Sequence, residues 1–177
     1  TAVNVTSTGA TEIQEQFAAG VGFTGGAGAE TITLGATTKA ITTGAGNDTV
    51  TVTSAFGVGG SVAAGDGDAD TLQGTTAVLN NLSSSGTFAT TVSGFERISV
   101  SDSAASNSVN LSNLGVINYV KSAGSAGTLT LSNAATGLTL EQTADATTGH
   151  TVQLKLDDTA DSMTLKVTGA ATIAAGT

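Results

Sequence analysis

Apolar and polar residues alternate through most of the chain in short runs, which glycine-rich turns interrupt. Ile32, Ile41 and Val50 stand nine residues apart, and each is followed by a threonine. The segments 129–131 and 138–140, both Leu-Thr-Leu, repeat the alternation at the same spacing of nine residues. Alternation with a period of two, broken by closely spaced turns, is typical of short β-strands. The chain is therefore predicted to be all-β.

Three turns between residues 25 and 74 share one order of residues. Gly25–Glu30, Thr43–Asp48 and Gly65–Asp70 each combine glycines with a closing acid, and each is followed by threonine and an apolar residue. They match the nonapeptide G-G-x-G-x-D-x-U-x, where U is a large apolar residue, of calcium-binding parallel β-structures. The predicted fold class is an all-β parallel β-roll or β-solenoid with calcium-binding turns, which continues as irregular solenoid coils.

The spacing of the acids predicts how the turns lie in space. Glu30 and Asp48 are eighteen residues apart, which is two nonapeptides or one full coil of a β-roll, so their turns should stack on the same edge. The unit between them, residues 34–42, has Lys39 where the acid belongs, so the opposite edge should lack metal. The third turn starts twenty-two residues after the second, so the coil between them must bulge by about four residues.

Calcium chemistry explains these residue types. Calcium takes six to eight oxygen ligands in flexible geometry, and glycines let a turn aim several carbonyl oxygens at one point. One turn offers too few ligands, so one ion is expected between the first and second turns and another between the second and third. The predicted metal ligands are Gly26, Gly28, Glu30, Gly44, Gly46, Asp48, Gly65, Gly67, Asp68 and Asp70, with Asp66, Asp158 and Asp161 as weaker candidates.

The candidate acids differ in how well they suit calcium. Glu30 is longer than aspartate, which should loosen its site, and the extra residue of the third turn lets either Asp68 or Asp70 be the ligand. Asp48 lies in the middle turn that both ions share. Its replacement by alanine should therefore weaken binding more than that of Asp70, for which Asp68 can substitute. The acidic cluster at 157–161 lacks glycines, which favours a solvated turn over a metal site.

The composition fits an elongated core rather than a conventional one. The 177 residues are 39 % hydrophobic but only 3 % aromatic, and a solenoid can bury small aliphatic side chains between neighbouring coils. The net charge is −9 and the isoelectric point is near 4.1, which argues against nucleic acid and anionic membranes as partners. The absence of cysteine excludes disulfides and thiol chemistry.

Residues suited to catalysis are scarce. His150 is the one histidine of the chain and there is no cysteine, so a zinc or copper site is not expected. Nothing in the sequence places a serine and an acid around His150, and no nucleophile-elbow motif occurs, so a Ser-His-Asp hydrolase is not expected either. No catalytic residue and no enzyme activity are predicted.

The chain is predicted to be one continuous domain with three parts. Residues 1–20 should hold a first strand and then, over 11–19, a short helix or alternatively another coil. The β-roll should occupy 21–80, followed by a loop at 80–86. Residues 81–177 should form an irregular β-solenoid, with a β-sandwich as the main alternative. No signal peptide or membrane-spanning run is recognised, and both ends look like those of a piece of a longer protein.

The segment from about Gly20 to Val100 resembles the calcium-binding RTX-type S-layer proteins of the Caulobacter kind. The resemblance rests on FTGGAGAETITLGATTKAI, TGAGNDTVTV, GVGGSV, GDGDADTL and GFERISV, whereas beyond about residue 105 only composition and strand rhythm are similar. It implies a structural subunit that leaves the cell by type I secretion and folds outside in calcium. There it would join copies of itself in a two-dimensional lattice on the bacterial surface. The anchoring domain and C-terminal secretion signal of such proteins are not evident here.

Two other functions are left open by the sequence. The chain could be an accessory RTX β-roll of a secreted protease or lipase, which a zincin or G-x-S-x-G motif in flanking sequence would favour. It could also be a calcium-rigidified segment of a giant adhesin, which tandem copies of the whole unit would favour.

Overall fold

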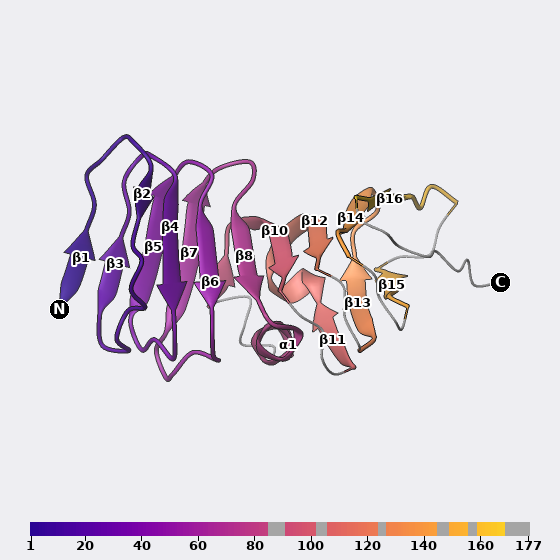
Figure 1. Ribbon diagram of the computed structural model, residues 1–177, viewed down its shortest axis with the longest axis horizontal. Coiled ribbons are helices and arrows are strands. Elements are labelled where there is room, and N and C mark those ends of the chain that lie inside the picture. Colours follow the sequence, from indigo (N-terminus) through magenta and orange to yellow (C-terminus); the bar gives the residue numbers. More distant parts are fainter. Residues whose placement is uncertain (85–90, 102–105, 124–126, 145–148, 156–158, 169–177) are drawn as a thin grey trace.

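The computed structural model describes residues 1–84, 91–101, 106–123, 127–144, 149–155 and 159–168. They form a parallel β-solenoid of about seven turns, whose coils stack along the long axis of the molecule (Figure 1). Every strand pairing in the described part is parallel. The predicted all-β parallel solenoid is confirmed, and the described residues do not form the alternative β-sandwich.

Odd- and even-numbered strands alternate along the chain and belong to different sheets. One sheet has five strands: β1 (Ala2–Asn4), β3 (Gly22–Thr24), β5 (Ala40–Ala45), β7 (Ser61–Asp66) and β9 (Val92–Ser93). A second has three: β11 (Asn107–Asn110), β13 (Leu129–Ala134) and β15 (Thr151–Leu154). The third has eight: β2 (Thr11–Glu12), β4 (Glu30–Leu34), β6 (Thr49–Val52), β8 (Thr71–Gly74), β10 (Phe95–Val100), β12 (Gly115–Ser122), β14 (Leu138–Gln142) and β16 (Met163–Val167).

The register of the strands confirms that two nonapeptides make one coil. Ile32 of β4 pairs with Val50 of β6, eighteen residues later, while Ile41 lies on β5 in the other sheet. One nonapeptide is therefore half a coil. The turns that end in Glu30 and Asp48 consequently stack on the same edge, as the spacing predicts.

The longer third coil absorbs its extra residues in two places. Along the five-stranded sheet Phe23 pairs with Ile41, eighteen residues away, but Ile41 pairs with Val62, which is twenty-one away. Three extra residues therefore lie in the turn before β7, where Gly59 has a φ of 83° and Val58 is 99 % exposed. Along the eight-stranded sheet the separation grows to twenty-two residues, so the fourth extra residue lies in the Gly65–Asp70 turn.

One continuous apolar core fills the solenoid because the strands alternate inward and outward residues. Burying each such side chain contributes about 1.5–3 kcal/mol, and parallel stacking repeats the contribution coil after coil. The buried apolar residues include Phe23, Ile32, Leu34, Ile41, Val50, Val52, Val62, Leu72, Phe95, Ile98, Val109, Val120, Leu129, Leu131, Leu138 and Leu140.

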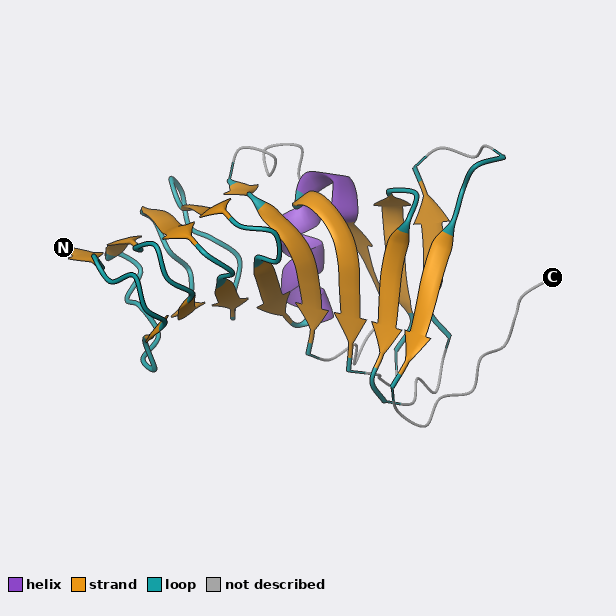
Figure 2. Cartoon of the chain, turned by 90° about the horizontal axis from the view of Figure 1, so that it is seen from above, coloured by secondary structure: helices purple, strands orange, loops and turns teal. Residues whose placement is uncertain are grey.

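An α-helix, α1 (Thr76–Ser83), interrupts the coils after β8 (purple in Figure 2) and lies beside β11 (Figure 1). Thr75 caps it, because its hydroxyl accepts a hydrogen bond from the backbone N of Val78 at 3.3 Å. Leu79 and Leu82 face the core and are fully buried. A Cβ on Gly74 would stand 3.1 Å from Val52 and 3.5 Å from Leu79, so the glycine makes room for the helix.

One local prediction is wrong, and one open alternative is decided. The loop predicted at 80–86 is instead helical as far as Ser83, and residues 85–86 lie outside the described residues. The helix forms because Leu79 and Leu82 pack on the core, whereas the polar residues of this stretch indicate a loop. The helix considered for 11–19 does not form; this stretch contains β2 and a bridge between Phe17 and Leu34, so it is a coil of the solenoid. Within the described residues, no helix combines the length and apolarity that crossing a membrane requires.

Candidate metal centre

The three predicted turns connect β3 to β4, β5 to β6 and β7 to β8, and they stack in direct backbone contact. Gly44 has a φ of 106°, and a Cβ on it would stand 2.2 Å from the carbonyl oxygen of Gly26. Gly65 has a φ of 98°, and its Cβ would stand 1.9 Å from the carbonyl oxygen of Gly44. Only glycine satisfies both the backbone angle and the close approach. Gly28, Gly46 and Gly67 form a second column of close backbone approaches, in which Gly46 has a φ of 113°.

The closing acids of the turns form a hydrogen-bonded column. The Oδ1 of Asp48 accepts a hydrogen bond from the backbone N of Glu30 at 2.7 Å. The Oδ1 of Asp70 accepts one from the backbone N of Asp48, also at 2.7 Å. All three residues are fully buried. Each aspartate therefore reaches from its own turn to the turn of the preceding coil.

Four carboxylate oxygens in this column have no hydrogen-bond partner although they are buried. They are both Oε atoms of Glu30, Oδ2 of Asp48 and Oδ2 of Asp70. An unpaired buried charge is costly, and native proteins neutralise, pair or ligate such groups. The column is therefore incomplete without a bound cation or protons.

The electrostatics of the column point the same way. Burial raises the pKa of Glu30, the nearby negative charge of Asp48 raises it further, and the nearby backbone N–H of Gly26 lowers it. Burial also raises the pKa of Asp70; the hydrogen bond from the Asp48 backbone opposes this, while the charges of Asp48, Glu96 and Asp68 add to it. The surroundings of Glu30 and Asp70 thus disfavour their charged forms, and a bound divalent cation would oppose this effect.

The arrangement fits the ligand needs of calcium. A Cβ on Gly25 would stand 2.9 Å from Oε2 of Glu30, and one on Gly67 would stand 2.7 Å from Oδ2 of Asp70, so these carboxylates lie inside their glycine turns. No three Asp, Glu, His or Cys side chains of the described residues converge on one point. A cation here would therefore need backbone carbonyls besides one or two carboxylates, and calcium accepts such a mixed oxygen set.

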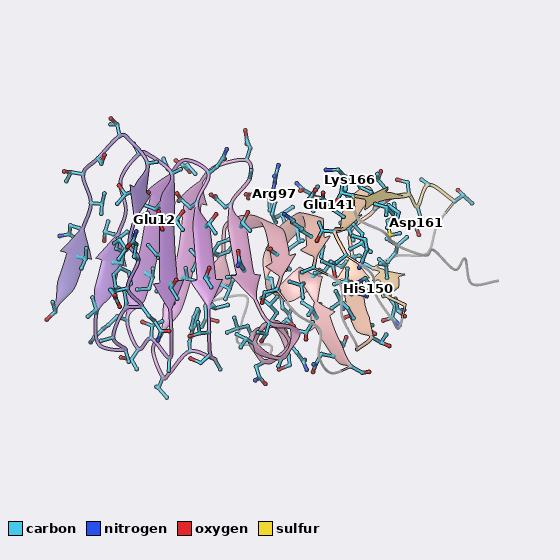
Figure 3. The ribbon with its side chains drawn as sticks, in the orientation of Figure 1. Glu12, Arg97, Glu141, His150, Asp161 and Lys166 are labelled. Atoms are coloured by element: carbon cyan, nitrogen blue, oxygen red, sulfur yellow. The ribbon has the colours of Figure 1, made fainter. Side chains whose placement is uncertain are left out.

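The column selects among the predicted acids. Asp70 lies in it, whereas Asp68 and Asp66 are exposed beside it. Lys39 is exposed near the turn that precedes β5, on the edge opposite the column. Asp161 lies at the far end of the solenoid, close to the start of β16 and away from the three turns (Figure 3). Asp158 falls outside the described residues.

Glu96 is the residue of this column that sequence reasoning missed. Its Oε2 accepts a hydrogen bond from the backbone N of Asp70 at 3.0 Å, as Asp70 does from Asp48. The available signal was the order acid, polar, apolar in Glu96-Arg97-Ile98, which repeats Asp70-Thr71-Leu72. The missing glycines and the twenty-six-residue spacing hid it.

His150 has a serine neighbour that the sequence did not predict. The Oγ of Ser122, at the end of β12, lies 2.9 Å from Nε2 of His150. Burial lowers the pKa of His150, and its Nδ1 is buried without a hydrogen-bond partner. Ser122 is itself fully buried, so this pair joins two coils rather than presenting a nucleophile at the surface.

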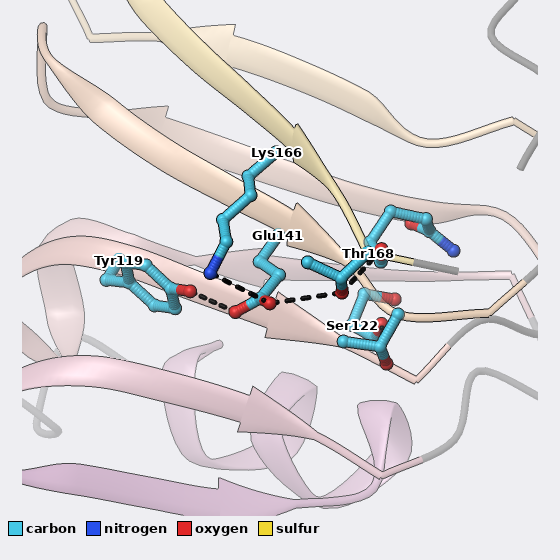
Figure 4. Close-up of polar contacts among 7 residues, drawn as sticks. Tyr119, Ser122, Glu141, Lys166 and Thr168 are labelled. Atoms are coloured by element: carbon cyan, nitrogen blue, oxygen red, sulfur yellow. Dashed lines mark hydrogen bonds and ion pairs between the residues drawn. The ribbon is translucent and has the colours of Figure 1, made fainter. Parts of the chain in front are cut away.

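A polar network on the eight-stranded sheet was also missed (Figure 4). The Tyr119 hydroxyl donates to Oε2 of Glu141, whose Oε1 lies 3.1 Å from Nζ of Lys166 and accepts a hydrogen bond from Thr168. The hydrogen bond from Tyr119, followed by that from Lys166, lowers the pKa of Glu141 to about 2. The guanidinium of Arg97 lies 5.1 Å from the Tyr119 ring centroid, so the network links β10, β12, β14 and the end of β16.

Comparison with known proteins leaves the candidate site to be judged on its own geometry. No known family matches the chain, and no curated protein matches it either.

Proposed function

We propose that this chain is a structural module of a bacterial surface layer, which folds when its stacked turns bind calcium outside the cell. The observation that carries the proposal is the buried carboxylate column at Glu30, Asp48 and Asp70, with four oxygens that no protein group partners. A purely structural turn would satisfy these oxygens with backbone amides or bury no carboxylate at all.

Calcium couples folding to the environment in this proposal. Without the ion the carboxylates repel one another, and the glycine-rich turns lose much conformational entropy on ordering. An ion that binds the folded form alone stabilises it by RT ln(1 + [L]/Kd), about 2.7 kcal/mol at a hundredfold excess over Kd. Two ions, one between each pair of neighbouring turns, would shift a marginal chain to the folded state.

The ends of the described solenoid support the assembly part of the proposal. β16 is the last strand of its sheet in the described part, and Met163, Leu165 and Val167 on it are 42 %, 39 % and 36 % exposed. A strand with an unpaired edge and apolar side chains readily pairs with another chain. Such an edge can pair with a further coil of the same protein or with a strand of another subunit, and the second is what a lattice needs.

The calcium part is tested by circular dichroism and thermal melting of the chain in millimolar calcium and in excess chelator. We expect a large loss of β-structure or of melting temperature in chelator, and magnesium at the same concentration serves as the control because it prefers near-ideal octahedral sites. Equal β-content and equal melting temperature in calcium and in chelator would contradict the proposal.

The assembly part is tested separately by electron microscopy of the chain after calcium addition. Ordered two-dimensional sheets support a lattice-forming module. A calcium-loaded chain that stays monomeric at high concentration contradicts the lattice role while leaving calcium-dependent folding intact.

A further inference from the structure

The coil that follows the third turn repeats the hydrogen bonds of the carboxylate column, although its sequence lacks the glycine-rich turn. In the second coil step, Asp70 accepts from the backbone N of Asp48, and Thr71 donates its backbone N–H to the Asp48 carbonyl at 2.8 Å. In the third, Glu96 accepts from the backbone N of Asp70, and Arg97 donates to the Asp70 carbonyl at 3.0 Å. Glu96 thus accepts a hydrogen bond from the closing acid of the third turn, as Asp70 does from the closing acid of the second.

The coil of Glu96 also packs against the third turn. A single glycine, Gly94, separates β9 from β10, and its φ is 79°. A Cβ on Gly94 would stand 3.0 Å from the backbone N of Gly65, so this backbone lies directly on the Gly65–Asp70 turn. The third turn is therefore contacted by the second turn on one side and, at Gly65 and Asp70, by the Gly94–Glu96 segment on the other, while residues 65–68 stay exposed.

A buried carboxylate oxygen without a hydrogen-bond partner belongs to this turn. Asp70 is fully buried, its Oδ2 has no hydrogen-bond partner, and a Cβ built on Gly67 would stand 2.7 Å from that atom, with only the carbonyl oxygen of Gly46 nearer. Asp70 Oδ1 is already used by the backbone of Asp48, so Oδ2 is free for a ligand inside the third turn. Glu96, which is half-buried, brings a second carboxylate to the same place.

We propose that Glu96 completes a third calcium site, between the Gly65–Asp70 turn and the Gly94–Glu96 segment, and so ends the metal-bearing stack. This inference rests on the proposed calcium-dependent function. Glu96 and Asp70 supply the two carboxylates, and carbonyls of the third turn supply further oxygens. The stack ends there because the coil of Glu96 has no glycine-rich turn of its own to hold another ion.

The test counts calcium ions per chain by native mass spectrometry and measures each step by calorimetry, with calcium alone as the probe. The unmodified chain should bind three ions and Glu96→Gln only two, with the two tighter steps unchanged. Glu96→Asp, which keeps the charge on a shorter side chain, should retain the third ion with an affinity reduced about tenfold. Glu15→Gln, an exposed glutamate far from the third turn, is the matched control and should bind three.

The outcomes separate the two proposals. If the unmodified chain and Glu96→Gln both bind two ions, or both bind three, the inference about Glu96 is wrong. Either result leaves the proposed calcium-dependent function intact. No calcium binding by the unmodified chain overturns both. If Glu96→Gln does not fold in calcium, Glu96→Asp decides: unchanged affinity for a third ion contradicts the inference, and a weakened third step supports it.

Discussion

At the scale of single residues, burial distinguishes acids that look equivalent in the sequence. Asp66, Asp68 and Asp70 lie within five residues, yet of the three only Asp70 is buried, and its carboxylate accepts a hydrogen bond from the preceding coil. Asp68 points its backbone N–H to Asn47 Oδ1 at 3.3 Å, and its side chain is exposed. An exposed carboxylate is screened by water and contributes little to holding an ion that buried oxygens already surround.

Asp70→Asn should therefore weaken calcium binding strongly, whereas Asp68→Asn should change it little. Loss of the Asp70 charge removes a ligand oxygen from a buried site, and we expect an affinity loss of about tenfold or more. Calorimetric titration of both variants measures the difference. Equal losses in the two variants would show that Asp68 substitutes for Asp70, as the spacing alone allowed.

At the scale of elements, the turns depend on glycine for two separate reasons. Gly44 combines a positive φ with a close approach to the Gly26 carbonyl. Gly137, before β14, has a φ of 81°, but a Cβ on it would have no neighbour within 4 Å. The two positions share the backbone requirement, and only Gly44 adds the stacking requirement.

Gly44→Ala should consequently destabilise the calcium-loaded chain well beyond Gly137→Ala. The positive φ alone costs about 1–2 kcal/mol for alanine, which is the loss expected for Gly137→Ala. At Gly44 the turns must also move apart, which separates the carboxylates that share an ion. Denaturant unfolding in calcium measures both losses, and a Gly44→Ala loss no larger than that of Gly137→Ala would contradict the tight stacking of turns.

At the scale of the whole molecule, the solenoid gathers charges that lie far apart in the chain into groups with opposite responses to pH. Glu30 and Asp70 lack a cationic partner and have raised pKa values. Glu141, paired with Tyr119 and Lys166, has a pKa lowered to about 2. Its contribution to stability is therefore complete above its ordinary value of 4.5 and is lost only as the pH falls from there towards 2.

Acidification from pH 7 to pH 5 should narrow the difference between the melting temperatures in calcium and in chelator. The raised pKa values of Glu30 and Asp70 mean that, in chelator, the folded chain binds protons at a higher pH than the unfolded chain does. The folded chain is therefore stabilised as the pH falls towards the ordinary values of 4.5 and 3.8. In calcium, protons compete with the ion and stability falls.

The comparison of the two conditions removes the effect of His150. Its lowered pKa makes folding less favourable as the pH falls below its ordinary value of 6.5, but equally with and without calcium. A difference in melting temperature that stays constant or widens between pH 7 and pH 5 would contradict protonation of the carboxylate column.

Local sequence patterns predicted the regular coils, but they failed where contacts between distant segments decide the structure. The nine-residue spacing of Ile32, Ile41 and Val50 was enough for the fold class and for stacking of the first two turns, because strand alternation and glycine turns are local properties. Helix α1 was missed because its stability comes from Leu79 and Leu82 packing on the core, while its asparagines and serines indicate a loop. Glu96 and the pair Ser122 and His150 were missed because their partners lie twenty-six or more residues away.

The sequence by itself determined that the chain coils as a parallel solenoid and that acid-tipped glycine turns share one edge, since a strict repeat leaves one way to bury its apolar residues. Only the tertiary structure decided which acids are enclosed: Asp70 rather than Asp68, with Glu96 added after a coil that breaks the repeat. The physical reason is that enclosure depends on the backbone of the next coil, and the path of that backbone through α1 and Gly94 is set by packing against the whole core.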